Sequence, residues 1–103
     1  RIWCKAAPGW DANLMYGGLD RKTGRHLFVL DLTRRAFNGP DGPEFWKNRT
    51  FNLTFHPSLS GEAELVAITD SFVACHGATA EYDRKRRVLH LRFRLPGQIT
   101  IEV

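Results

Sequence analysis

The chain has 103 residues, the usual size of one domain and too short for two cores of ordinary size, so we expect a single domain over residues 1–103. Hydrophobic residues make up 43% of the sequence and aromatic residues 12%, which excludes the composition of an intrinsically disordered chain. The 15 Lys and Arg residues outnumber the 11 Asp and Glu residues, and the net charge of +4 favours acidic partners, nucleic acid among them, without establishing one.

The apolar runs and the cysteines bear on where the protein works. The longest apolar runs, at 27–30 and 65–68, fall far short of the roughly 20 residues that a membrane-spanning helix needs, so we expect no membrane partner. No secretory signal pattern is present, and we expect a cytoplasmic location with secretion left open. Cys4 and Cys75 are too few for a disulfide scaffold, and free buried thiols are the favoured interpretation.

A β-hairpin is expected in the first third of the chain. Residues 13–19 form its first strand and the sequence 20–24 its turn, because Gly24 tolerates positive φ. Residues 26–33 form the second strand, and their nearly continuous apolar run predicts a central position in a sheet.

The longest irregular stretch, residues 34–49, is a predicted loop because Gly and Pro interrupt it repeatedly. Its second half predicts one short helical turn near 42–48, with Asp41 as the N-cap and Glu44 as its partner in a capping box. Such a turn would position Trp46.

Strict alternation of apolar and polar side chains predicts strands at 50–55, 88–95 and 99–103, because successive side chains of a strand point to opposite faces. Residues 64–74 read as a further strand, and residues 77–82 are expected to pair with 88–95 across a basic turn. The Pro96-Gly97 turn then predicts that the last strand leaves its neighbour to join another sheet or to close a barrel.

These elements predict an all-β fold, either an antiparallel β-sandwich or an open β-barrel of about seven strands. The short turn near 42–48 is the minor helical content that we expect. A layered α/β fold is excluded because no long amphipathic helix pattern is present.

The basic hairpin is the sharpest candidate for a binding site. Its turn and the outward face of its second strand carry cations that could neutralise phosphates or carboxylates, and a nearby aromatic ring could stack on a ligand. The candidate residues are Arg84, Lys85, Arg86, Arg87, His90, Arg92, Arg94 and Trp46. The alternative is that the cations only solubilise this face and protect an edge strand, and that the aromatic residue fills the core.

Signals for catalysis or for a metal are poor. The histidines at 26, 56, 76 and 90 show no metal-ligand spacing, so we expect no metal and no cofactor. Cys75 and His76 are adjacent in sequence, and on a strand they would face opposite ways, so they cannot form a nucleophile and base pair.

Asp31 and Asp70 are the best candidates for acid–base chemistry, because each interrupts apolar sequence, although an ion pair explains such residues equally well. The sequence favours a non-catalytic binding or interaction domain that engages an anionic ligand or a protein partner through the basic sheet face. Two alternatives stay open: a small barrel enzyme or small-molecule binder with an aromatic-lined pocket, and a homodimer formed by strand edges.

Overall fold

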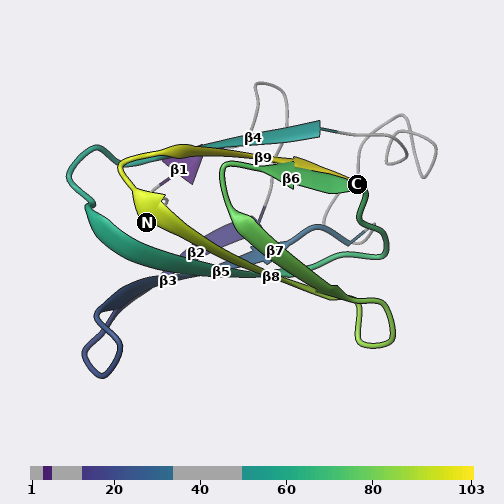
Figure 1. Cartoon of the computed structure of the whole chain (residues 1–103), viewed down its shortest axis with the longest axis horizontal. Coiled ribbons are helices and arrows are strands. Elements are labelled where there is room, and N and C mark those ends of the chain that lie inside the picture. Colours follow the sequence, from purple (N-terminus) through teal and green to yellow (C-terminus); the bar gives the residue numbers. More distant parts are fainter. Residues whose placement is uncertain (1–3, 6–12, 34–49) are drawn as a thin grey trace.

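The computed structural model describes residues 4–5, 13–33 and 50–103. Within them the strands are β1 (Cys4–Lys5), β2 (Asn13–Asp20), β3 (Arg25–Asp31), β4 (Thr50–Phe55), β5 (Gly61–Ile68), β6 (Ala74–His76), β7 (Thr79–Asp83), β8 (Val88–Leu95) and β9 (Gln98–Glu102). They form a four-stranded sheet in the order β1-β4-β9-β6 and a five-stranded sheet in the order β2-β3-β5-β8-β7, which lie as two layers (Figure 1).

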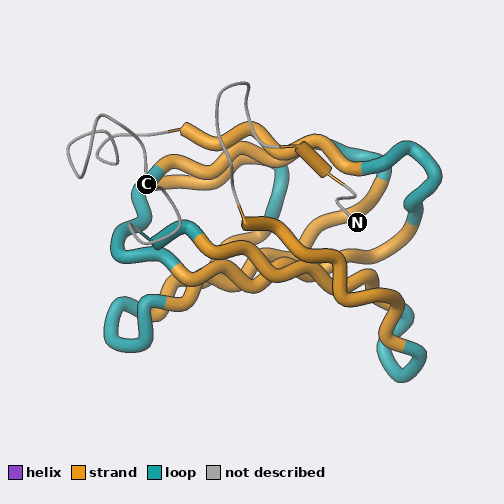
Figure 2. Tube along the Cα trace, turned by 180° about the vertical axis from the view of Figure 1, so that it is seen from behind, coloured by secondary structure: helices purple, strands orange, loops and turns teal. Residues whose placement is uncertain are grey.

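This arrangement confirms the predicted all-β sandwich, and the two sheets do not close into a barrel (Figure 2). The part of the chain that the structure describes contains no helix of the length and apolarity needed to cross a bilayer. The helical turn expected near 42–48 lies outside the described residues.

The alternating sequences create a core between the two sheets. On β8 the inward residues are buried while their neighbours point to the outer face; the inward set is Leu89, Leu91, Phe93 and Leu95. Aromatic rings join the layers, because Phe55 of β4 lies 4.9 Å from Phe28 of β3 and 5.0 Å from Phe93 of β8, measured between ring centroids. Burying each such side chain contributes about 1.5–3 kcal/mol.

Both predicted hairpins are confirmed, β2–β3 and β7–β8, and their turns lie at opposite ends of the five-stranded sheet (Figure 1). The final strand also behaves as expected. After Pro96 and Gly97, β9 leaves β8 and pairs with β4 and β6 in the other sheet.

Residues 64–74 do not form one strand, which corrects the sequence prediction. β5 ends at Ile68, and the chain crosses to the other sheet before β6 begins at Ala74. Thr69 marks the crossing: it is fully buried, its hydroxyl donates to the Ser71 carbonyl at 2.7 Å, and its amide donates to the Arg87 carbonyl at 2.9 Å.

The prediction of a wholly antiparallel sheet is also wrong for the five-stranded sheet. Its strands β3 and β5 run parallel, from His26 opposite Ala63 to Asp31 opposite Ile68. The reason is the connection: the chain passes through β4 in the other sheet before it returns as β5.

Candidate functional site

The β7–β8 hairpin places four of the candidate residues, Arg84 to Arg87, in its turn at one end of the five-stranded sheet. Asp83 fixes its turn, because the Asp83 Oδ1 atom accepts hydrogen bonds from the amides of Lys85 at 3.0 Å and Arg86 at 3.1 Å. Arg87 ends the turn with a φ of 59°, a left-handed conformation that is uncommon for a residue other than glycine. The turn is therefore held by Asp83 and the backbone, which leaves its basic side chains to project into solvent.

Two of these side chains have carboxylate neighbours that neutralise them only weakly. Arg86 Nε lies 3.9 Å from Asp83 and Arg87 Nη1 lies 3.3 Å from Asp70. The Arg86 and Arg87 side chains are 83% and 67% exposed, and ion pairs this exposed contribute about 0–1 kcal/mol. Both guanidinium groups therefore remain accessible to a ligand.

The other two turn cations have no carboxylate partner among the described residues. Arg84 lies over the ring of Tyr82, with its Cζ atom 6.0 Å from the ring centroid, in the range of a cation–π contact. Lys85 is exposed at the tip. The turn therefore carries more positive charge than its carboxylates balance.

On β8 itself the expected run of cations is interrupted by carboxylates. The register of β5 and β8 sets Glu62 opposite Arg94 and Glu64 opposite Arg92. Arg94 Nη1 donates to Glu62 Oε1 at 2.5 Å, and His90 Nε2 contacts the Glu64 carboxylate. The outward face of β8 is therefore a surface of alternating charge instead of a contiguous cationic stripe, and its ion pairs are partly or largely exposed, not internal.

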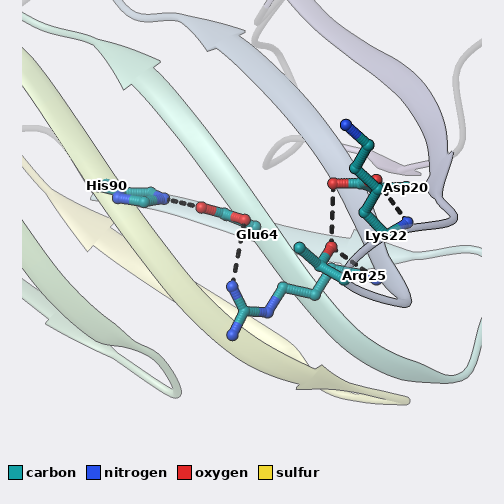
Figure 3. A network of polar contacts seen from close by, with 6 residues as sticks. Asp20, Lys22, Arg25, Glu64 and His90 are labelled. Atoms are coloured by element: carbon teal, nitrogen blue, oxygen red, sulfur yellow. Dashed lines mark hydrogen bonds and ion pairs between the residues drawn. The ribbon is translucent and has the colours of Figure 1, made fainter.

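Glu64 belongs to a wider polar network on this outer face (Figure 3). Besides His90, its carboxylate meets Arg25 Nη1 of β3 at 3.7 Å. Arg25 follows the β2–β3 turn, in which Asp20 accepts a hydrogen bond from the Lys22 amide at 3.0 Å. The network lies across the four strands β2, β3, β5 and β8, and only the pairing of those strands could have revealed it.

An open groove of about 620 Å³ follows the β7–β8 hairpin. Three candidate residues line it together, Arg84, Arg86 and His90. The remaining lining residues are Glu81, Tyr82, Asp83 and Val88. The groove can therefore offer guanidinium groups to an anion at its turn end, with a carboxylate and an apolar side chain farther along.

The other sequence candidates lie apart from this groove. Trp46 falls outside the described residues. The Asp31 carboxylate accepts hydrogen bonds from the amide and hydroxyl of Thr33 at 2.9 and 2.7 Å, and Asp70 pairs with Arg87. The ion pair that was the alternative to acid–base chemistry is therefore found for Asp70, whereas Asp31 is held by hydrogen bonds with Thr33.

The histidines have separate partners and do not converge. The contacts are His26 with Tyr16 and the Ser60 carbonyl, His56 with Ser58, His76 with Glu102, and His90 with Glu64. Residues 13–33 and 50–103 contain no group of three or more potential metal ligands.

Cys75 is a free, half-buried thiol on β6. Burial raises the pKa of this thiol above its ordinary value, because the charged thiolate is poorly solvated there. The thiol is therefore protonated at neutral pH and is a weak nucleophile.

Comparison of the chain with known protein families, with curated protein sequences and with solved structures gives no match.

Proposed function

We propose that this chain is a non-catalytic binding domain that engages an anionic group of its partner through the turn of the β7–β8 hairpin. The observation that carries the proposal is the run of four exposed cations at 84–87 on a turn whose backbone Asp83 already holds. A turn ordered before binding loses less conformational entropy when the partner arrives. Its guanidinium groups can also grip a carboxylate or a phosphate through two hydrogen bonds.

The charge pattern along the strands restricts the kind of ligand that this surface suits. Glu62, Glu64 and Glu81 point outward beside the cations of β8, so a long polyanion laid along the sheet would meet repulsion. A local anionic group at the turn avoids these carboxylates. The proposed contact is therefore confined to the turn and the groove beside it.

The two hairpin turns of the chain supply a matched test. The variant Arg84→Gln/Lys85→Gln and the control Arg21→Gln/Lys22→Gln each remove two cations from an Asp-led turn, at opposite ends of one sheet. With a fluorescein-labelled oligoglutamate peptide as the probe, fluorescence anisotropy should show about tenfold weaker binding for the first variant and little change for the control.

Salt provides the second arm of this test. The affinity of the unaltered chain for oligoglutamate should fall as sodium chloride is raised, because screening weakens contacts between exposed charges. If the two double variants lose equal affinity for oligoglutamate, the net charge of the chain alone explains binding and the proposal is contradicted. An affinity that does not change with salt would contradict it as well.

A further inference from the structure

β7 is an edge strand with an unpaired side. Among the strands that the structure describes, it pairs with β8 alone, in unbroken register from Thr79 opposite Arg92 to Asp83 opposite Val88. Among the described residues no other backbone group bonds to it. Its outer side therefore presents free N–H and C=O groups of the kind that accept another strand.

The opposite edge of the same sheet, β2, is built differently. Its register with β3 shifts between Tyr16 and Gly18, and Gly18 adopts a φ of 94°. This bulge breaks the row of backbone groups and bends the strand, which is a common way to protect an edge from pairing. β7 has no such device within the described residues, so the two edges are not equivalent.

The described residues also cover the core incompletely beside β7. β6, which directly precedes β7, is the end strand of the four-stranded sheet, so both sheets end on this side of the sandwich. Phe72 and Tyr82 meet here, with ring centroids 5.6 Å apart. The apolar residues that pack on the core here remain half-buried, and they are Phe72, Cys75, Ala78, Ala80 and Tyr82. Apolar side chains of an added strand would have a surface to cover.

The charges on the outer side of β7 change along its length. Glu81 is exposed, and it has no hydrogen bond or ion pair within the described residues. At the turn end Arg84 and Arg86 line the groove. A strand laid along β7 would therefore be favoured by a basic residue beside Glu81 and an acidic residue beside the turn.

We propose that β7 is the docking edge for an extended segment of a partner polypeptide, which adds to the five-stranded sheet antiparallel to β7. The segment alternates apolar residues, which cover Ala80 and Tyr82, with outward polar residues that include a cation for Glu81 and a carboxylate for Arg84 and Arg86. Backbone hydrogen bonds supply affinity in this mode and the alternating side chains supply specificity. The inference rests on the proposed function, because the carboxylate uses the same turn cations.

A second copy of this chain fits the edge less well. Antiparallel pairing of two β7 strands about Glu81 sets the two Glu81 side chains opposite each other, and a shift toward the turn sets Glu81 opposite Asp83. Like charges directly opposite in a sheet are destabilising. In these two registers the charge pattern therefore favours a strand of different sequence.

The test uses the full chain and two synthetic peptides of identical composition. The first, capped Glu-Val-Thr-Val-Lys-Val-Thr, sets its Lys beside Glu81 and its Glu beside the turn when it runs antiparallel to β7. The second exchanges Glu and Lys. The first peptide should bind about threefold more tightly. Glu81→Lys should weaken that preference, because only the contact between the peptide Glu and the turn cations then favours the first peptide.

Amide hydrogen exchange measured by NMR separates strand addition from simple contact with the turn. Amides of residues 79–83 that exchange fast in the free protein should slow about tenfold with saturating first peptide, while the amides of β2 stay unchanged. Peptide binding without protection of β7, or no peptide binding, overturns the inference. The proposed function survives either result if the binding of oligoglutamate still depends on Arg84 and Lys85.

Analytical sedimentation of the free chain tests whether a second copy of the chain pairs with β7. A monomer with fast-exchanging β7 amides is the expected state. A dimer with β7 already protected would make a second copy the occupant and would overturn the proposal of a foreign strand.

Discussion

Asp20 and Asp83 have the same role in the two hairpin turns. Each carboxylate accepts a hydrogen bond at 3.0 Å from the amide two residues ahead, that of Lys22 in one turn and Lys85 in the other. This local bond explains why an aspartate leads both turns, since it holds the backbone without help from the basic residues. The cations that follow are thus free to act in binding, and the turn after Asp83 carries more of them.

A second prediction for a single residue concerns how the reactivity of the Cys75 thiol depends on pH. Because burial raises the pKa of its thiol, the thiolate should form only at higher pH than in an ordinary exposed cysteine. In a Cys4→Ser variant, which leaves Cys75 as the only cysteine, alkylation by iodoacetamide followed by mass spectrometry should be slow at neutral pH. The rate should rise to that of a cysteine in a short peptide only after unfolding in urea. Alkylation of the folded chain at the peptide rate near pH 7 would show that the thiol is not shielded.

At the scale of elements, alternation located β4, β8 and β9 nearly to the residue, because each strand has one buried and one wet face. The prediction of one strand at 64–74 failed because apolar residues resume at 72–74 after the polar crossing at 69–71, where the buried Thr69 is held by hydrogen bonds with Arg87 and Tyr82. The parallel pairing of β3 with β5 was equally out of reach, since it depends on where β4 lies.

Gly77 controls the passage from β6 to β7 and thus the placement of the proposed edge. Its φ is 88°, and a Cβ atom there would lie 2.4 Å from the carbonyl oxygen of Gln98. Gly77→Ala should lower the free energy of unfolding by about 2–4 kcal/mol, because backbone strain adds to a clash with a second backbone.

Gly24→Ala is the matched control for that prediction. Gly24 also has positive φ, at 71°, but a Cβ atom added there would meet nothing within 4 Å. Its substitution should cost only about 1 kcal/mol in urea unfolding, from the left-handed backbone alone. Equal costs for the two variants would mean that the contact with Gln98 does not constrain the crossover.

At the scale of the whole molecule, the binding surface was only partly predictable. The sequence located the cations of the β7–β8 hairpin and the outward direction of Arg92 and Arg94, both of which follow from local pattern. It did not reveal that Glu62 and Glu64 lie beside them, because neighbours across a sheet depend on register between distant strands. That register pairs Arg94 and His90 with carboxylates, and it leaves the turn cations Arg84 and Lys85, together with Arg92, without an ion pair among the described residues.

The central claim, that the β7–β8 hairpin is the binding surface, is tested most directly by NMR mapping of oligoglutamate on the full chain. We predict that the largest amide shifts fall within residues 79–94, with small shifts in the β2–β3 turn at 21–24 although it also carries two cations. Largest shifts at 21–24, or shifts spread evenly over both ends of the sheet, would contradict the account.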